Sequence, residues 1–291
     1  MTATKKTHRY VLLFILICLS AVVAFPLMVT VTNSFMSEAE ITQNYSTNLS
    51  MFDALDNNPV NFINMNLIPS AVAPAQYAEV LVNQPSFLAL MLNSIKITVP
   101  VVAGTILVSL ASAFGFTVWQ FKYKEVIFYV YIVVMLMPLQ AVLVPNYIIA
   151  RDLGILESYL AIILPGIFAP FGTFLLRQSM KSIPTPYFEA ARIDGAGNMY
   201  IFWRIVMPQM KSGIAALAML TFIEYWNIVE QSVIFIKDYY KEPLSVYLSR
   251  VGDGKMGLIF AASCVYMFLP LWFLALGQRD LEKGIELSGV K

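Results

Sequence analysis

Long runs of hydrophobic residues alternate with shorter polar segments along the whole chain. Six of these runs are close to or above the roughly 20 residues that a helix needs to cross a bilayer. They cover residues 10–32, 97–119, 126–150, 158–176, 213–229 and 257–277. The fifth run is interrupted by Glu224 and is expected to extend back toward Trp203. The pattern predicts an all-α polytopic membrane protein with six transmembrane helices.

The first run follows three cations, Lys5, Lys6 and Arg9, as the core of a secretory signal would. Its apolar stretch is longer than the about 7–15 residues of a signal core. We therefore expect residues 10–32 to be a retained membrane anchor.

Lysine and arginine are distributed unevenly between the segments that connect the runs. Segment 33–86 contains five carboxylates and neither Lys nor Arg, whereas 13 of the 19 cations lie in the segments assigned to the other side. Because cytoplasmic loops carry an excess of Lys and Arg, segment 33–86 is predicted to lie outside, with both chain ends in the cytoplasm. The expected parts are a cytoplasmic N-terminus 1–9, the anchor 10–32, an extracytoplasmic loop 33–86 with one or two short helices, a five-helix core 87–278 and a cytoplasmic tail 279–291.

The composition supports a membrane location and excludes several kinds of site. Hydrophobic residues make up 58% of the chain and charged residues only 13%, against about 25% charged in soluble proteins. The net charge of +1 provides no excess of cations for nucleic acid. His8, the only histidine, lies in the N-terminal tail, and Cys18 and Cys264 lie inside apolar runs. No metal site, disulfide framework or cofactor is expected.

The cytoplasmic segment 177–212 has the signals of two short helices joined by a sharp turn. Thr185 suits an N-cap and Pro186 the first helical position, where a missing N–H costs nothing. Gly195 and Gly197 then supply permissive dihedral angles that end the helix, and Asn198 can cap the next one. Two such helices would make a compact knob under the membrane.

The residue pattern of this knob is similar to the EAA loop of ABC importer permeases. Residues 189–208 read Glu-Ala-Ala, three residues, Gly, nine residues, Ile, one residue, Met-Pro. Met207 departs from the family pattern, which usually has Leu there, and Ser212 stands where a second proline is common. The resemblance implies that contacts with an ATPase are made by Glu189, Ala190, Ala191, Asp194, Gly195, Ile205 and Pro208.

Further motifs resemble the maltose-permease-like, carbohydrate-importing family and extend the match over most of the chain. They are Asn93-Ser94, Met137-Pro138-Leu139-Gln140, Leu153-Gly154-Ile155-Leu156, Trp226-Asn227 and the tail from Gln278 to Lys291. The resemblance implies the type I ABC importer fold in a bacterial inner membrane. It also implies three kinds of partner: a second homologous permease, two cytoplasmic ATPase subunits and an extracytoplasmic solute-binding protein.

The chain is not expected to be an enzyme. It contains no G-x-x-x-x-G-K-[ST] phosphate-binding loop, so ATP hydrolysis is expected in a separate subunit. In the family, the EAA helix docks in a groove of the ATPase, and the resemblance implies that Glu189 pairs there with a basic group.

Several polar residues lie inside the predicted spans. Thr221, Glu224 and Asn227 follow each other at intervals of three and lie roughly along one helical face, and Gln140 and Asn146 lie in the third span. Such residues usually face a water-filled path or the bundle interior. They are candidates for the translocation pathway, with interhelical hydrogen bonding as the alternative.

The predicted outer loop, residues 230–256, combines aromatic residues, both signs of charge and glycines, in Asp238-Tyr239-Tyr240-Lys241 and Gly252-Asp253-Gly254. In the maltose-type family this loop reaches into the cleft of the binding protein. The alternative is a solvated connector.

Other kinds of transporter remain as alternatives. An ABC importer permease for glycerol phosphate or an amino acid is the nearest. A secondary transporter would need ion-coupling charges at mid-membrane and internal repeats, and only Glu224 stands out there.

Overall fold

The computed structural model describes residues 2–45, 66–250 and 256–288, and these form helices and connecting loops without a β-strand. They divide into two units, Met1–Phe87 with Arg250–Met267, and Leu88–Ser249 with Phe268–Lys291. Four helical stretches are long and apolar enough to cross a membrane, namely Arg9–Asn33, Pro85–Val118, Leu160–Lys181 and Met256–Gly284. Two bent helix pairs raise the number to six if each pair is one span. The predicted all-α fold is confirmed.

The first unit contains the predicted anchor and short helices that follow it. Its elements are α1 (Thr2–Asn33), α2 (Glu38–Tyr45), α3 (Ala75–Ala78), the π-helix η1 (Glu79–Asn83) and the first part of α15 (Met256–Ser288). The apolar side chains of α1 are largely exposed, as expected for a helix that contacts lipid. Hydrogen bonds join the segment after α1 to α3: the Gln76 amide donates to the carbonyl of Met36 at 2.6 Å. Within the described residues, segment 33–86 is thus built from short helices.

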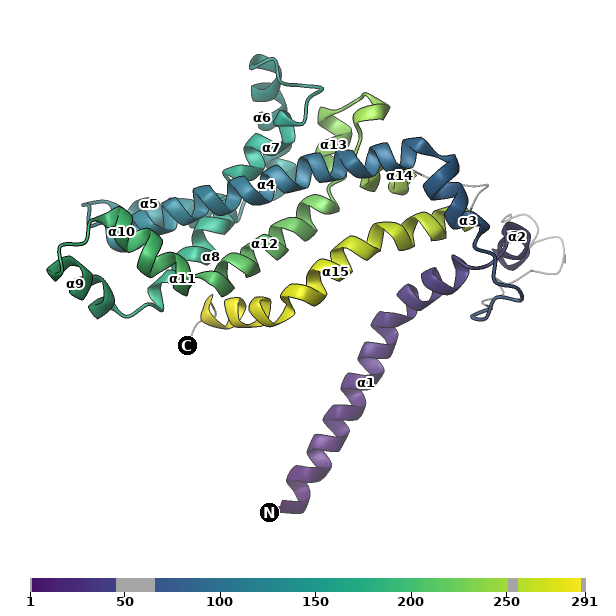
Figure 1. Cartoon of the computed structure of the whole chain (residues 1–291), viewed down its shortest axis with the longest axis horizontal. Coiled ribbons are helices and arrows are strands. Elements are labelled where there is room, and N and C mark those ends of the chain that lie inside the picture. Colours follow the sequence, from purple (N-terminus) through teal and green to yellow (C-terminus); the bar gives the residue numbers. More distant parts are fainter. Residues whose placement is uncertain (1, 46–65, 251–255, 289–291) are drawn as a thin grey trace. The chain divides into compact units, whose positions relative to one another are not determined.

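The second unit contains the rest of the helices (Figure 1). They are α4 (Pro85–Val118), α5 (Lys124–Met135), α6 (Leu139–Asp152), α7 (Leu160–Ile167), α8 (Pro170–Lys181), α9 (Thr185–Ile193), α10 (Asn198–Ile201), the π-helix η2 (Phe202–Val206), α11 (Met207–Gln209), α12 (Lys211–Trp226), α13 (Glu230–Phe235), the 3₁₀ helix η3 (Tyr239–Lys241), α14 (Leu244–Arg250) and the second part of α15.

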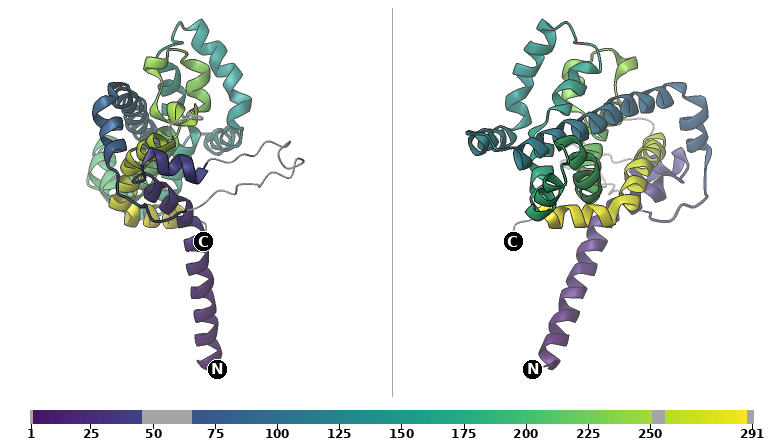
Figure 2. Two further views of the ribbon diagram at one scale, coloured as in Figure 1. Left: turned by 90° about the vertical axis from the view of Figure 1, so that its right-hand side faces the viewer. Right: turned by 60° about the vertical axis from the view of Figure 1, so that its left-hand side comes forward.

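The third apolar run, 126–150, is not one straight helix. Helices α5 and α6 meet at 100°, so that α6 turns away from the direction of α5 (Figure 1 and Figure 2). Pro138 explains the break, because it has no N–H to donate and its extended backbone (ψ 144°) precedes the first residue of α6. The fifth run is also bent: α10–α11 and α12 meet at 73°. The helix therefore does not continue straight back toward Trp203.

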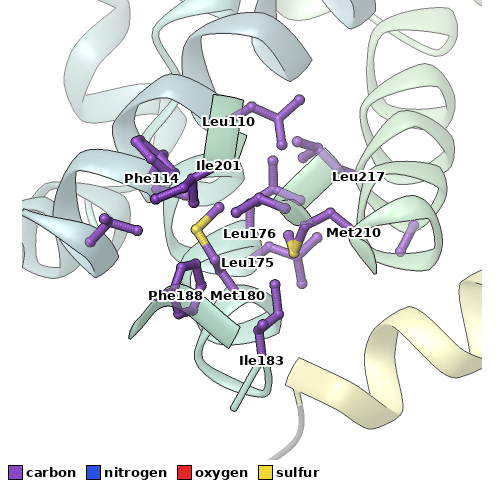
Figure 3. Packing of buried hydrophobic residues seen from close by; sticks show 14 of the residues in the cluster. Leu110, Phe114, Leu175, Leu176, Met180, Ile183, Phe188, Ile201, Met210 and Leu217 are labelled. Carbon is purple, nitrogen blue, oxygen red and sulfur yellow. The ribbon is translucent and has the colours of Figure 1, made fainter. Parts of the chain in front are cut away.

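Two apolar clusters hold the second unit together. The first, which we call the knob core, joins α9–α11 to α4, α8 and α12 (Figure 3), with buried side chains that include Leu110, Phe114, Leu175, Leu176, Met180, Ile183, Phe188, Ile201, Met210 and Leu217. The second joins α4, α6, α7, α12 and α13. Helices α4 and α8 approach so closely that a Cβ on Gly172 would lie 2.3 Å from the Ser109 hydroxyl oxygen, which is the small-residue packing typical of membrane helices.

Candidate coupling surface and translocation cavity

The predicted knob, residues 184–209, is two short helices joined by a tight turn. Gly195 has a φ of +80°, a conformation that L side chains rarely adopt, so its predicted role in the turn is confirmed. Three backbone bonds close the turn, among them the Ala196 N–H to the Ala191 carbonyl at 2.9 Å. The expected caps differ. Pro184, with extended backbone, precedes α9 instead of Thr185, and Gly197, with an ordinary φ of −72°, precedes α10 instead of Asn198.

One side of the knob is buried in the knob core. Phe188 and Ala191 on α9 are buried, as are Ile201 and Val206 beyond the turn. Phe202 meets the Phe114 ring of α4 edge-on at a centroid distance of 5.2 Å. These contacts orient the knob on helices α4, α8 and α12 through apolar packing.

The other side of the knob is exposed and hollowed. A groove of about 510 Å³ lies between α9 and α10–η2. Five of the seven predicted coupling residues line it: Ala190, Ala191, Asp194, Gly195 and Ile205. Glu189 and Pro208 do not, but both are exposed. Glu189 forms neither a hydrogen bond nor an ion pair with any residue that the structure describes.

Four further residues line the groove that were not among the predicted coupling residues. They are Tyr187, Ala196, Tyr200 and Arg204. Tyr187 lies three residues before Ala190, so helical spacing was a signal available in the sequence. Tyr200 lies on α10 and Arg204 on η2, and both reach the groove only because the chain folds back after the turn.

An ion pair between α5 and α8 involves a buried guanidinium, and no pattern in the sequence indicated it. The guanidinium of Arg177 on α8 is 2.6 Å from the carboxylate of Glu125 on α5 and 3.7 Å from the centroid of the Phe128 ring. Arg177 is 1% exposed and Glu125 59%. The contact fixes α8 to α5 near the end of α8 that leads into the knob.

A cavity of about 390 Å³ is lined by residues of α4 to α8, α12 and α13 and of the turns between them. Of the five pathway candidates, Asn146, Thr221 and Glu224 line it. Gln140 and Asn227 do not. The Gln140 amide instead donates to the Glu230 carboxylate at 3.2 Å, and the Asn227 amide donates to the Ile223 carbonyl of its own helix at 2.8 Å.

Other polar and aromatic residues complete the lining. Gln231 on α13 is buried, and its side-chain oxygen accepts no hydrogen bond in the described part of the chain. Thr105 donates to the carbonyl of Gly166 at 3.1 Å, and the rings of Phe171 and Tyr225 contribute apolar surface. Gln231 was missed because it lies beyond the predicted span, on a short helix that folds back to the cavity.

The predicted outer loop contains a segment, residues 236–243, that hydrogen bonds hold in place; we call it the loop tip. The Glu157 carboxylate accepts from the backbone N–H groups of Lys237 (2.8 Å) and Asp238 (3.3 Å). Glu157 itself has a φ of +60°, which is uncommon for a residue other than glycine. The Asn93 amide donates to the carbonyls of Tyr240 and Glu242 at 2.8 and 3.1 Å. Gly252-Asp253-Gly254 lies outside the described residues.

These contacts present two tyrosines to solvent. Tyr239 and Tyr240 stack edge-on at 5.8 Å, and Tyr240 is 78% exposed. The Leu244 N–H, at the start of α14, donates to the Ser94 hydroxyl at 2.9 Å. The Asn93-Ser94 motif of α4 therefore binds both the loop tip and the residue that follows it.

Comparisons with known proteins agree with this geometry. Residues 105–279 match the family described as binding-protein-dependent transport system inner membrane component. The chain is 33% identical over 242 residues to the sn-glycerol-3-phosphate transport system permease protein UgpE of Yersinia enterocolitica, covering 80% of this chain and 86% of that protein. It is 30% identical to the protein of the same name from Salmonella choleraesuis, covering 91% of each.

A solved structure shares the fold. It is a bacterial ABC transporter involved in the import of the acidic polysaccharide alginate, with a TM-score of 0.74 and 21% identity, over 95% of this chain and 97% of the matched chain. The permease is not itself catalytic, and its family implies a complex with an ATPase and a binding protein. The chain belongs to the binding-protein-dependent inner membrane components and is a multi-pass permease of a bacterial ABC importer.

Proposed function

We propose that this chain forms half of the translocation path of a carbohydrate importer. Its partners are a second homologous permease, two ATPase subunits that dock on the knobs and a solute-binding protein that docks on the outer loop. Both chain ends, the knob and the tail 279–291 lie in the cytoplasm, and segment 33–86 lies outside. The observation that carries the proposal is the knob, whose apolar side is anchored in the permease while its motif side is exposed and grooved.

The helices that the knob contacts explain how movement of the knob is coupled to the cavity. The knob core includes Leu175 and Leu176 of α8 and Leu217 of α12. The same two helices carry Gly172 and Thr221, which line the cavity. A displacement of the knob by the ATPase is therefore transmitted through packed side chains to the walls of the cavity. Such a packed element switches between two arrangements rather than deforming gradually.

The exposed Glu189 is the contact that orients the knob on the ATPase. A carboxylate that has no partner among the described residues is available for a charge-assisted contact with a basic group of the ATPase, which gives orientation as well as affinity. Ala190, Ala191 and Gly195 leave the groove beside it shallow enough for the partner's backbone to approach. Asp194, Ile205 and Pro208 complete the surface.

Uptake by reconstituted vesicles tests the proposal. The complete transporter would be placed in proteoliposomes with ATP inside and its binding protein outside, and uptake of labelled maltose, sn-glycerol 3-phosphate and an amino acid mixture would be compared. We expect ATP-dependent uptake of the sugar that disappears without binding protein. A transporter whose ATPase Walker lysine is replaced is the control. Uptake of the amino acids alone would contradict the carbohydrate assignment.

Glycerol phosphate is the second candidate solute, because the curated relatives described above are named for its transport. The same experiment separates it from a neutral sugar.

A further inference from the structure

The charge of the side chains that line the cavity affects which solutes the cavity accepts. Of the residues that line it, Glu224 alone has a carboxyl group, and the lining includes no Lys, Arg or His. Within the described residues, Glu224 has no ion-pair or hydrogen-bond partner. The nearest cation on α8, Arg177, is already bound to Glu125. When Glu224 is ionised, its negative charge therefore has no counter-charge among the residues that the structure describes.

A second observation concerns hydrogen-bond acceptors. The side chain of Gln231 is 8% exposed, lines the cavity and has an oxygen, Oε1, that is buried and accepts no hydrogen bond from the described residues. A buried acceptor without a donor is costly, so a ligand that brings a donor is favoured there. Glu224 is likewise an acceptor when ionised. The Gln231 oxygen and the Glu224 carboxylate can each accept a hydrogen bond from a hydroxyl or ammonium group. Neither can bond to the oxygens of a phosphate or carboxylate, because those oxygens are acceptors themselves.

We propose that the cavity accepts neutral, hydroxyl-bearing solutes and repels anionic ones, with Glu224 as the selecting group and Gln231 as a hydrogen-bond acceptor for solute hydroxyls. This proposal rests on the proposed function, since it assigns a solute class to the same cavity. Asn146 and Thr221 supply additional hydrogen bonds, and the rings of Phe171 and Tyr225 supply surface for the C–H faces of a sugar. The chain would then differ in selectivity from proteins named for glycerol phosphate or alginate.

The size of the repulsion is large enough to decide selectivity. Two like charges about 6 Å apart at an effective dielectric constant of about 20 weaken binding roughly a hundredfold. A neutral solute of the same shape is not affected by this repulsion.

Thiol modification in the complete transporter tests the charge without knowledge of the solute. Cys18 and Cys264 would be replaced by Ser, and Asn146→Cys would place one thiol on the cavity wall. The rates of reaction with a cationic (trimethylammonium) and an anionic (sulfonate) ethyl methanethiosulfonate would be measured, each divided by its rate with 2-mercaptoethanol. We expect the normalised cation-to-anion ratio to be about tenfold or more above one.

Matched substitutions assign the effect to Glu224. Glu224→Gln should reduce the ratio by about tenfold. Glu230→Gln is the control, because its carboxylate does not line the cavity and is bonded to Gln140; it should change the ratio by less than about twofold. A ratio near one, or a ratio that Glu224→Gln leaves unchanged, would overturn the proposal.

A second thiol position is used in case the cysteine at residue 146 reacts poorly. Met137→Cys lies on the same wall, and Met137 is 52% exposed. If neither thiol reacts with either reagent, the cavity is closed to solutes and the proposal is wrong. Efficient uptake of sn-glycerol 3-phosphate by the wild-type transporter would also overturn it. Absence of any sugar uptake would instead defeat the proposed function, while the thiol rates would still report the cavity charge.

Discussion

The knob and the loop tip are both surface features of the second unit, but they are held in opposite ways. The knob is anchored by buried apolar side chains, and its motif carboxylate, Glu189, has no bonding partner in the part of the chain that the structure describes. The loop tip is held by hydrogen bonds from Glu157 and Asn93 to its backbone, and it exposes aromatic rings. Apolar packing transmits force from a partner to the helices, whereas a hydrogen-bonded loop fixes the shape of a recognition surface. The difference suits an energy-coupling contact at one place and a recognition contact at the other.

The largest effect is expected from reversing the charge of the unpaired knob carboxylate. Glu189→Lys should lower transport at least about a hundredfold, because it places a cation against the basic group of the ATPase. The variant should remain in the membrane fraction, since Glu189 forms no hydrogen bond or ion pair with the described residues. Glu189→Gln, which keeps the shape and some hydrogen bonding, should retain more activity. Normal uptake by Glu189→Lys would show that the knob couples through other residues.

The loop tip should affect recognition without affecting assembly. Replacing residues 238–241 with a Gly/Ser linker removes Tyr239 and Tyr240 and the Asp238 bonds. We expect the ATPase to copurify as before, but its stimulation by sugar-loaded binding protein should fall about tenfold or more. ATPase assays in nanodiscs with and without that protein measure this. Undiminished stimulation would make the outer loop a connector.

A pair of truncations compares the two kinds of support directly. Phe188→Ala removes a buried ring of the knob core and should cost about 3 kcal/mol of local stability. Glu157→Ala removes the acceptor of two backbone N–H groups near solvent and should cost only about 1 kcal/mol. Hydrogen exchange would show faster exchange in α9 for the first and at Lys237 and Asp238 for the second. Equal costs would mean that the two regions do not differ as described.

The last comparison in this series concerns the knob turn. A Cβ on Gly195 would meet no atom within 4 Å, so the cost of Gly195→Val arises only from the backbone φ of +80° and should be about 1–3 kcal/mol. Gly195→Asn is the control, because Asn tolerates this conformation better. Reduced copurification of the ATPase with the Val variant alone is the expected result. If Val is tolerated with wild-type transport, the turn geometry is wrong.

Features that depend on local chemistry could be predicted from the sequence. One such feature is the glycine turn of the knob. Another is the pair Thr221 and Glu224, which lie one helical turn apart on α12. Asn227 lies outside the lining of this cavity because α12 ends at Trp226, and helical periodicity does not continue past the end of a helix. Gln140 lies outside that lining because it is in the first turn of α6, after the 100° bend, where it bonds to Glu230.

Features that depend on tertiary contacts could not be predicted. Arg177 and Glu125 are 52 positions apart, and nothing in either local sequence links them. Gln231 reaches the cavity only because α13 folds back beyond the predicted span. The short π-helix η2, which carries Arg204 of the groove, likewise has no signature in a single sequence.

The ion pair between α5 and α8 reverses the usual relation between exposure and tolerance to mutation. Replacing the exposed Glu125 by Ala would leave the buried guanidinium of Arg177 without its counter-charge, whereas Arg177→Met would remove the buried charge and leave a carboxylate that water can solvate. We expect the melting temperature of the purified permease to fall further for Glu125→Ala. A ranking of mutations by burial alone would therefore predict the larger effect at Arg177, whereas we expect it at Glu125. Evolution is accordingly expected to conserve the exposed Glu125 more strictly than the buried Arg177.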